Sequence, residues 1–436
     1  MRIALVVHNF PPESIAGTEV YVSNLAQEFS KNHEVLVVTR TQDRGYSQYK
    51  VLKSREGKVE VVRIANDYED LVSFEMFYRN PVIDRIFYHL LKEFQPEIIH
   101  FHHLLNLSLG LIDVGKEMKI PMLMTLHDYW YQCPRIQRIR PKGLELCPEI
   151  DPKTCARCVS NWTQELDRIS WNDYQVSALL LSRQVKDIEQ RSSFIRQQLL
   201  KLDCLISPSQ FLLNEYVRFG IPKGKLILVE NGVTVSAKFL RDKKKTHYPL
   251  HFGFIGTLIP PKGVHVLLEA FSKLEKGSAE LHIYGPDCGY EYHEDYGRRI
   301  RSYAEKRNDI FFHGEFDPPS LPDVLKNIDV LVIPAIWYEN SPLITQEALG
   351  SGIPIIASRI GGIPEKIMEG KDGFLFEPGN VEELADYLKR CVEYSVRFLF
   401  QLSEDHDFSS MRKHVEKLVL IYKELESPLS LCEYST

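Results

Sequence analysis

Short runs of consecutive apolar, often β-branched residues recur along the chain, separated by longer segments with helical spacing. The first series comprises Ile3–Val7, Val35–Val38, Val59–Ile64, Ile98–Phe101, Met122–Leu126, Cys204–Ile206 and Leu226–Val229. The second comprises Phe252–Ile255, Leu281–Tyr284, Ile310–Phe312, Val330–Ile333 and Ile355–Ala357. Continuous apolar runs, unlike alternating ones, are typical of strands covered on both faces. Each series therefore predicts a doubly wound parallel sheet of the α/β class.

A charged segment without strand patterns separates the two series. Residues 234–250 include the cluster Arg241-Asp242-Lys243-Lys244-Lys245, which is typical of a solvated linker. We therefore predict a first domain over residues 1–235 and a second over residues 250–400.

The last apolar pattern of the chain has helical spacing. It comprises Val415, Leu418, Ile421, Tyr422 and Leu425. Positions three and four residues apart share one face of a helix, so residues 401–436 are expected to contain an amphipathic helix.

Both predicted domains begin with a strand, a glycine-containing turn and a helix. The first turn contains Ala16-Gly17-Thr18-Glu19, and the second contains Gly256-Thr257-Leu258 and Lys262-Gly263. Ligands of open parallel sheets bind at the carboxyl ends of the strands, where such turns lie. Neither turn is a complete G-x-G-x-x-G motif, so the sequence does not indicate a dinucleotide-dependent dehydrogenase.

Length, charge and hydropathy narrow the class of protein. A chain of 436 residues is too long for one hydrophobic core. Its net charge of −6 provides no basic excess for binding nucleic acid. The first apolar run ends at His8 and Pro11, which is typical of a buried strand and not of a signal peptide. Since no run of 18 apolar residues exists, we expect a cytoplasmic protein, with a peripheral contact at the inner face of a membrane left open.

The most informative segment is Glu339–Gly352, which has two glutamates around a predicted helix start. Ser341 is a favourable N-cap, and Pro342 fits the first helical position. The free amides and positive dipole end of such a helix favour a phosphate. Glu339 then lies in the loop that faces the ligand, and Glu347 lies within the helix, where it can reach a ribose.

This segment resembles the E-x7-E motif of the family 4 retaining glycosyltransferases, which have the GT-B fold. Residues 351–358 (Ser-Gly-Ile-Pro-Ile-Ile-Ala-Ser) and 361–365 (Gly-Gly-Ile-Pro-Glu) fit the same pattern. The resemblance implies two Rossmann-like domains facing a central cleft, with the C-terminal helix crossing back to the first domain. It also implies transfer of a sugar from a nucleotide-sugar donor to a glycan or lipid-linked acceptor, in surface polysaccharide or glycoconjugate synthesis.

The resemblance assigns the donor site largely to the second domain. It implies donor contacts from Gly256, Thr257, Lys262, Asn340, Ser341, Leu343 and Glu347, and from Gly17 in the first domain. The resemblance also gives catalytic roles to Lys262 and Glu339. A lysine suits a diphosphate, because it carries a compact positive charge on a flexible side chain. The family normally has an arginine where this chain has Thr257, so one of two cationic contacts is missing. A tight turn that needs glycine is the alternative explanation for Gly17.

Histidines follow two strands of the first domain. His127 resembles the family's active-site histidine, and a neutral imidazole can both donate to and accept from sugar hydroxyls. His102 and His103 belong to a cluster with His100 that invites a metal interpretation. We favour acceptor contacts instead, because residues 100 and 102 leave the strand on one face and residue 103 on the other.

A cysteine-rich insert, about residues 131–160, follows His127. Its four cysteines are Cys133, Cys147, Cys155 and Cys158. A compact set that ends in C-x2-C is more often a structural zinc site than a pair of disulfides in a cytoplasmic chain, although disulfides or free thiols stay open. Arg135 and Arg138 in the same insert fit an anionic acceptor.

No cofactor is expected for the chemistry itself. GT-B members need no divalent metal for transfer, and the departing diphosphate is thought to help deprotonate the acceptor on the same face of the sugar. Two other interpretations stay open. One is another GT-B enzyme, such as a glycan phosphorylase or a nucleotide-sugar epimerase. The other is a non-catalytic sugar-binding partner of a transferase, which the missing arginine suggests.

Overall fold

The computed structural model shows two compact units. It describes residues 1–67, 70, 73–159, 174–234, 246–394, 396–400 and 410–426. Unit 1 comprises residues 1–137, 148–232 and 411–436, and unit 2 comprises residues 138–147 and 233–410. The charged cluster at 241–245 and the end of the chain after residue 426 lie outside the described residues.

Unit 1 is built on an eight-stranded sheet with the strand order β10-β9-β6-β5-β1-β2-β4-β3. The strands are β1 (Arg2–Val6), β2 (Glu34–Thr41), β3 (Val51–Glu56), β4 (Val59–Ala65), β5 (Ile98–Phe101), β6 (Met122–Thr125), β9 (Cys204–Ser207) and β10 (Leu226–Leu228). All neighbouring strands are parallel except β3 and β4, which pair antiparallel. The helices are α1 (Gly17–Phe29), α2 (Pro81–Phe94), α3 (Leu111–Glu117), α4 (Pro152–Cys158), α6 (Tyr174–Lys201), α7 (Gln210–Arg218) and α14 (Met411–Glu426).

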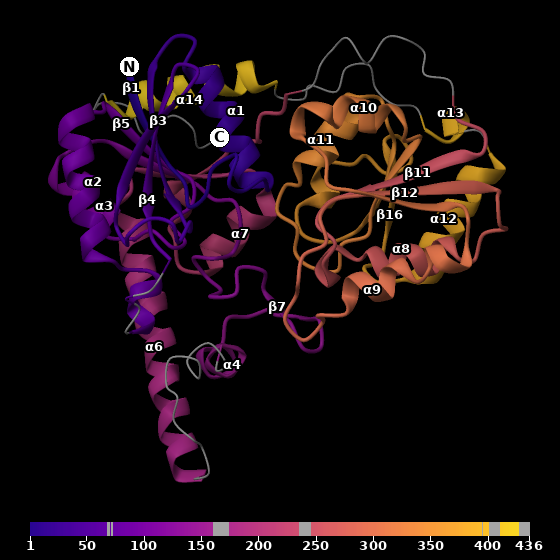
Figure 1. The fold of residues 1–436 in the computed structure, drawn as a ribbon, viewed down its shortest axis with the longest axis horizontal. Helices are drawn as coiled ribbons and strands as arrows, with labels where there is room; N and C mark the ends of the chain where they lie inside the picture. Colours follow the sequence, from indigo (N-terminus) through magenta and orange to yellow (C-terminus); the bar gives the residue numbers. More distant parts are fainter. Residues whose placement is uncertain are drawn as a thin grey trace. The chain divides into compact units, whose positions relative to one another are not determined.

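The α14 helix packs on unit 1, although it follows unit 2 in the sequence (Figure 1). Its Tyr422 ring stacks on Phe29 of α1, with ring centroids 5.6 Å apart. Its buried face comprises Met411, His414, Val415, Leu418 and Tyr422. Two polar side chains thus lie on an otherwise apolar stripe.

Unit 2 has a six-stranded parallel sheet with the order β13-β12-β11-β14-β15-β16. The strands are β11 (Leu250–Ile255), β12 (Ala279–Tyr284), β13 (Ile310–Gly314), β14 (Val330–Ile333), β15 (Ile355–Ser358) and β16 (Gly373–Phe376). The helices are α8 (Val264–Phe271), α9 (Tyr296–Arg301), α10 (Leu321–Lys326), α11 (Leu343–Gly350), α12 (Val381–Glu393) and α13 (Val396–Leu399). Helices cover both faces, as the continuous apolar strands require.

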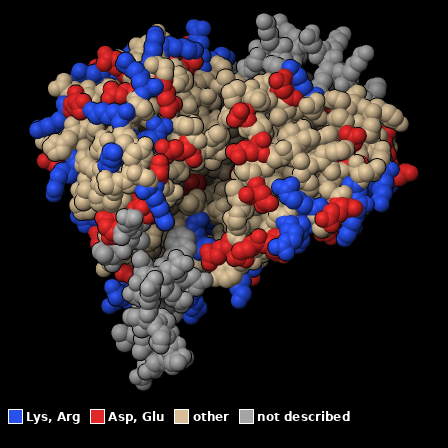
Figure 2. Space-filling model, viewed as in Figure 1, with Lys and Arg blue, Asp and Glu red and all other residues tan. Residues whose placement is uncertain are grey.

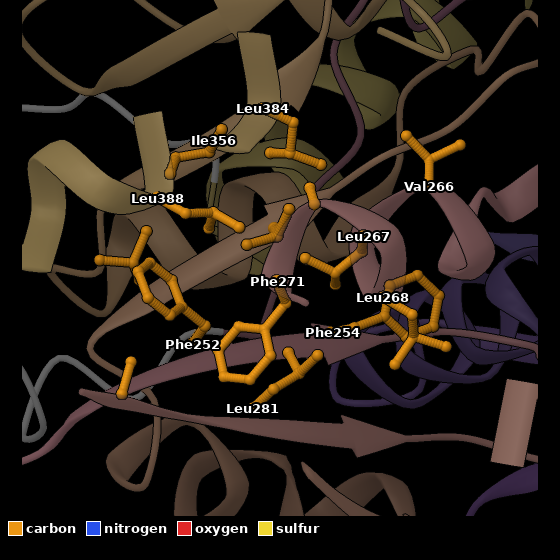
Figure 3. Close-up of a cluster of buried hydrophobic side chains, with 14 of the residues drawn as sticks. Phe252, Phe254, Val266, Leu267, Leu268, Phe271, Leu281, Ile356, Leu384 and Leu388 are labelled. Atoms are coloured by element: carbon orange, nitrogen blue, oxygen red, sulfur yellow. The ribbon is translucent and has the colours of Figure 1, made fainter. Parts of the chain in front are cut away.

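Alternate side chains of the unit 2 strands enter two separate cores. Phe252 and Leu281 pack with Phe271 of α8 and Leu384 of α12 on one face of the sheet (Figure 3). Leu331 and neighbouring side chains pack against α10 and α11 on the other face. The sheet is therefore packed on both faces, and the loops at its carboxyl end extend from this packed core.

A short hairpin from the cysteine-rich insert belongs to unit 2. Its strands are β7 (Ile139–Arg140) and β8 (Glu145–Leu146). Leu146 packs against the α10–α11 core, and the His293 side chain donates a 2.8 Å hydrogen bond to the Pro141 carbonyl. The prediction that the whole insert belongs to the first domain is therefore wrong, because unit 2 provides the apolar surface that the hairpin lacks.

Candidate functional site

The first candidate site lies where the strand order of unit 2 reverses. The chain proceeds outward from β11 through β12 to β13, and then outward on the other side from β14 through β15 to β16. Loops at such a switch point separate, so the carboxyl ends of β11 and β14 are the expected place for a ligand. Lys262 follows β11 and Glu339 follows β14.

Lys262 and Glu339 form an ion pair at this point. The Lys262 Nζ lies 2.6 Å from the Glu339 Oε1, and the Trp337 Nε1 donates to the same oxygen over 2.8 Å. The Lys262 ammonium also lies over the Trp337 ring, 5.3 Å from its centroid. Glu339 is only 5% exposed, whereas the Lys262 side chain is 28% exposed. Since an ammonium has three donors, Lys262 is oriented by Glu339 and retains hydrogen-bonding capacity for a ligand.

Two glycines of the recognised motifs allow the backbone to pack closely here. Gly263 has φ 74°, and a Cβ would lie 1.7 Å from the Pro334 carbonyl oxygen. Gly361 has φ 60°, and a Cβ would lie 2.0 Å from the Glu339 carbonyl oxygen. Only glycine tolerates both conditions without strain. These residues fix the positions of Lys262 and Glu339.

The start of α11 differs from the prediction. The helix begins at Leu343 with Pro342 as its N-cap, and Ser341 makes no capping hydrogen bond. The predicted Ser341 N-cap is therefore wrong. Pro342 has an extended backbone (ψ 122°), and its carbonyl already accepts from the Thr345 N–H over 3.0 Å. The buried Ser341 Oγ has no hydrogen-bond partner, so it remains available to a ligand at the helix start, next to Asn340, which is 7% exposed.

Glu347 is the second carboxylate of this site, on the fifth residue of α11. Its side chain is half-buried and makes no hydrogen bond or ion pair with any residue that the structure describes. Burial raises the pKa of Glu347 to about 7. A desolvated carboxylate without a partner is costly unless a ligand supplies donors, so Glu347 is suited to ribose hydroxyls.

Gly256 and Thr257 lie in the turn directly after β11. The Gly256 N–H donates to the Tyr284 carbonyl over 3.0 Å, and the Thr257 carbonyl accepts from the Ile259 N–H over 3.0 Å. The turn is thus held by backbone hydrogen bonds, and the Thr257 side chain is half-buried. Its hydroxyl cannot replace the charge of the family's arginine.

Unit 1 has its own switch point, between β1 and β5. His8 follows β1, His102 and His103 follow β5, and His127 follows β6. The Nδ1 of His102 lies 3.2 Å from the Nε2 of His127. The structure therefore brings the three predicted histidines together, and adds His8, which the sequence analysis did not select.

The buried His103 pairs with Asp128, whose side chain is 20% exposed. The His103 Nδ1 accepts from the Leu105 N–H over 3.1 Å, so the ring proton lies on Nε2, which donates to the Asp128 carboxylate over 3.0 Å. Burial would raise the pKa of Asp128, but His103 and the Trp130 N–H outweigh burial and lower it. Asp128 was missed because it directly follows the more conspicuous His127.

His127 is neutral in this environment. Burial, followed by the neighbouring His103, lowers the pKa of His127 to about 3. Burial likewise keeps the pKa of His102 well below its ordinary value. A base with so low a pKa removes protons poorly near pH 7. His127 can therefore act through hydrogen bonds, but not as a cation or an effective general base.

Two side chains of α14 complete this cluster. The Tyr21 hydroxyl lies 2.6 Å from the His414 Nε2, and the Tyr422 hydroxyl lies 2.6 Å from the His100 Nδ1. The Tyr21 ring also meets His127 edge-on, with ring centroids 5.2 Å apart. The α14 helix thus contacts the histidine cluster of unit 1 through His414 and Tyr422. A histidine and a tyrosine on the buried stripe were the available signal in the sequence.

Gly17 opens α1, and Glu19 orders the loop before it. Gly17 is exposed, its backbone is helical, and a Cβ would meet nothing within 4 Å. The tight-turn explanation for Gly17 is therefore wrong. The buried Glu19 carboxylate accepts from the Ser14 hydroxyl over 3.2 Å and lies 3.4 Å from the His8 Nε2.

The predicted acceptor arginines are engaged within the protein. Arg135 donates to the Cys158 carbonyl over 3.3 Å. The buried Arg138 donates from Nε to the Cys147 carbonyl over 3.1 Å, and its guanidinium lies over the Tyr338 ring of unit 2 at 5.5 Å. Both side chains stabilise the insert, and their contact with an acceptor stays a prediction.

The four insert cysteines are divided between the units, because Cys147 alone belongs to unit 2. None of the seven cysteines that the structure describes forms a disulfide. In the described ranges, the side-chain groups close enough to share one metal ion do not include these cysteines. The zinc site therefore stays a prediction.

Sequence comparison identifies two family profiles in the chain. The family described as "Glycosyltransferase Family 4" matches residues 15–169, and the family described as "Glycosyl transferases group 1" matches residues 236–404. Glycogen synthase from Mycobacterium tuberculosis is 24% identical over 398 residues, which is 90% of this chain and 86% of that protein. A putative colanic acid biosynthesis glycosyltransferase from Salmonella typhimurium is 27% identical over 208 residues, 46% of this chain and 49% of that protein.

Solved structures share the fold over nearly the whole chain. Sucrose-phosphate synthase from Thermosynechococcus elongatus has a TM-score of 0.67 at 18% identity, with 97% of this chain and 98% of that chain covered. HepE from Anabaena, in complex with UDP and glucose, has a TM-score of 0.62 at 15% identity, with 98% and 99% covered.

Among the described helices, none has the length and apolar character needed to cross a membrane.

Proposed function

We propose that this chain, which belongs to family 4 of the GT-B glycosyltransferases and is a nucleotide-sugar-dependent transferase, transfers a hexose with retention to a glycan or lipid-linked acceptor. The observation that carries this proposal is the arrangement at the unit 2 switch point. There, Lys262 is oriented by Glu339, while Glu347 on α11 is desolvated and has no side-chain partner among the described residues. A cation and a donor-accepting carboxylate on either side of a helix start match a diphosphate attached to a ribose.

A uridine diphosphate sugar is the donor we propose first. The fold neighbours include HepE structures with UDP and with UDP-glucose, and a trehalose-6-phosphate enzyme from E. coli with UDP-2-fluoro glucose. In this proposal, Lys262 and the amides at the start of α11 hold the diphosphate. Ser341 donates its free hydroxyl to the same group, and Glu347 accepts from the ribose.

Charge develops on the diphosphate as the sugar leaves, so fixed cations act mainly on the rate. Glu339 holds Lys262 in place for this step through its 2.6 Å ion pair. His127 is neutral and binds sugar hydroxyls, because its pKa of about 3 makes it a weak base. The departing diphosphate then accepts the acceptor proton on the same face of the sugar, which gives retention.

The acceptor side is proposed from unit 1. His102, His103 and His127 converge at its switch point, and neutral imidazoles suit hydroxyl-rich ligands. The relative that is named for colanic acid biosynthesis supports a role in surface polysaccharide or glycoconjugate synthesis.

The proposal is tested with a panel of nucleotide-sugar donors and two measurements, nucleoside diphosphate release and the configuration of the product. The protein is incubated with UDP-glucose, UDP-galactose, ADP-glucose and GDP-mannose, and release of nucleoside diphosphate is measured with and without short glycan and lipid-diphosphate acceptors. NMR of the product then gives the anomeric configuration. We expect acceptor-dependent release of UDP and a retained configuration. Release of sugar 1-phosphate from a glycan and added inorganic phosphate, without any nucleotide sugar, would instead favour a phosphorylase. Absence of turnover with tight binding would favour a sugar-binding partner.

A pair of variants connects turnover to the site. Glu339→Gln should lower turnover by about 10- to 100-fold, because the charge-assisted contact that orients Lys262 is lost. UDP affinity should change much less. Glu275→Gln, an exposed glutamate of the same unit, is the matched control. Equal turnover in both variants would contradict the assignment of Glu339.

A further inference from the structure

A second group of histidines and carboxylates lies in unit 2, at the amino-terminal ends of β11 and β12. His251 of β11 pairs in register with Glu280 of β12. His282 lies two residues beyond Glu280 and therefore projects from the same face of the strand. The sheet register alone brings these three side chains together.

Their ligand atoms are as close as those around one metal ion. The His251 Nε2 lies 3.1 Å from the Glu280 Oε2, and the His282 Nε2 lies 3.2 Å from the same oxygen. One ligand atom from each of the three residues lies within 4.8 Å of the others. Zinc bonds of about 2.0–2.1 Å in a tetrahedron place ligand atoms roughly 3.3 Å apart. The observed spacing requires little adjustment.

Hydrogen bonding fixes the orientation of the His251 ring. Its Nδ1 lies 3.1 Å from the Asn327 carbonyl oxygen, which can only accept. The neutral ring therefore carries its proton on Nδ1 and directs the Nε2 lone pair at the Glu280 carboxylate. Two acceptors at 3.1 Å repel each other unless a cation or a second proton lies between them. A backbone carbonyl on the second ring nitrogen is also the usual support of a metal-bound histidine.

His282 has an outer partner as well. Its Nδ1 lies 3.0 Å from the Nε2 of His313, and the His313 ring stacks on Tyr284 with centroids 4.3 Å apart. His313 is thereby held in place on the neighbouring strand. Both imidazoles thus have the second contact that orients a ligand.

The ligand atoms of a neighbouring trio, His247, His251 and Asp329, also lie within 4.8 Å of one another, but this trio suits an ion less well. The Asp329 carboxylate already accepts from the backbone N–H groups of His247 and His251, over 3.2 Å and 3.0 Å. The His247 ring stacks on His251 with centroids 4.1 Å apart and an interplanar angle of 7°. Asp329 thus fixes the backbone at the start of β11, and His247 covers one face of the His251 ring.

We propose that His251, Glu280 and His282 bind a divalent transition metal ion, with Zn²⁺ as the first candidate. Two imidazoles and one carboxylate are ligands that zinc accepts, and water completes the coordination. The three side chains are 17%, 28% and 12% exposed, so an ion can reach them. The site lies at the opposite end of β11 from Gly256, roughly 15 Å away along the strand. It is independent of the proposed donor site, and its effect is to tie β11 to β12.

The experiment uses the full-length protein after chelation and dialysis. Binding of Zn²⁺ is measured by calorimetry, and binding of Co²⁺ by absorption, where a site without thiolates lacks the sulfur charge-transfer band of a cysteine site. The variants are His251→Ala, His282→Ala and the isosteric Glu280→Gln. The control is His247→Ala, which removes the ring stacked on His251 and its contact with Asp329 but none of the three proposed ligands. Circular dichroism without metal checks the fold of each variant.

We expect the wild type and His247→Ala to bind one Co²⁺ ion that contributes no sulfur band, in addition to any ion that the insert cysteines hold. Each ligand variant should lose at least the roughly 10–100-fold in affinity that removal of an outer-shell partner costs. Loss of binding in His247→Ala equal to that in His282→Ala would overturn this ligand set. Absence of such a site in the wild type, with NMR showing His251 protonated beside Glu280, would overturn the metal proposal in favour of an ion pair.

Discussion

Glu347→Gln tests whether the proposed ribose carboxylate is held at the expense of folding stability. Burial raises its pKa from an ordinary 4.5 to about 7, so the folded unit disfavours the ionised form. The penalty is absent well below pH 4.5, grows between pH 4.5 and 7, and is complete above pH 7. Glutamine resembles the protonated acid, so the variant does not have this ionisation penalty. The variant should be more stable by about 1 kcal/mol at pH 5.5 and by about 3 kcal/mol at pH 8.

The assay must report on unit 2 alone. Hydrogen exchange along a urea series, read by mass spectrometry in peptides of β11, β14 and α11, gives the free energy of opening of this unit. Wild type and variant are compared at pH 5.5, 7 and 8, so that other titrating groups cancel in the difference. A stability difference that does not change with pH, or a variant less stable than the wild type at pH 8, would refute the reasoning.

Nucleotide binding should favour the ionised form of Glu347, whereas folding favours the protonated form. Ribose hydroxyls donate to the ionised carboxylate, so UDP affinity of the wild type should rise from pH 6 to pH 8 by more than that of Glu347→Gln. The UDP phosphate titrates in both cases alike. At pH 8 the variant should bind UDP more weakly by about 1.5–3 kcal/mol. Calorimetry measures both trends, and parallel pH profiles would show that Glu347 does not contact the nucleotide.

Three further predictions concern charge and metal. Lys262→Ala should lower turnover by about 100-fold, because no second cation was found in the motif to share the diphosphate; nucleoside diphosphate release measures this, Lys273→Ala is the control, and a neutral result would mean that another cation holds the phosphates. Thr257→Arg should tighten UDP binding without lowering the melting temperature, since it restores the family's second cation; unchanged affinity in calorimetry would show that the guanidinium does not reach the diphosphate. Protein purified without added metal should contain more zinc than Cys155→Ser, as elemental analysis can show; equal zinc in both would contradict a thiolate site.

Strands buried on both faces could be predicted because their sequences are apolar throughout. Of the two strands missed in the large sheets, β3 lacks that pattern, whereas β16 has three apolar residues after its glycine. β3 (Val51–Glu56) carries Lys53, Ser54 and Arg55 on an exposed antiparallel edge, and β16 is a four-residue edge strand that begins with glycine. The β7–β8 hairpin has two residues per strand, and its place in unit 2 depends on contacts with residues far along the chain.

The site was predictable where a motif places residues close in sequence, and not where the fold joins distant ones. The proposed roles of Lys262 and Glu339 rest on motifs, whereas their ion pair joins positions 77 residues apart. The predicted Ser341 N-cap was wrong because residue preferences at helix ends do not reveal that Pro342 has an extended backbone and itself caps the helix. His414 was missed because a histidine on a helix stripe looks like a tolerated polar residue until Tyr21 is placed opposite it.

The return of α14 to unit 1 has a consequence for synthesis on the ribosome. Unit 2 is encoded entirely before α14, so it can fold as soon as residue 410 has emerged, while unit 1 still lacks the helix that contacts Tyr21 and His100. The domain translated first is thus completed last. A ribosome stalled before residue 411, or a premature stop codon there, should release a chain with a folded unit 2 and an open histidine cluster, which would be recognised by chaperones and proteases through unit 1.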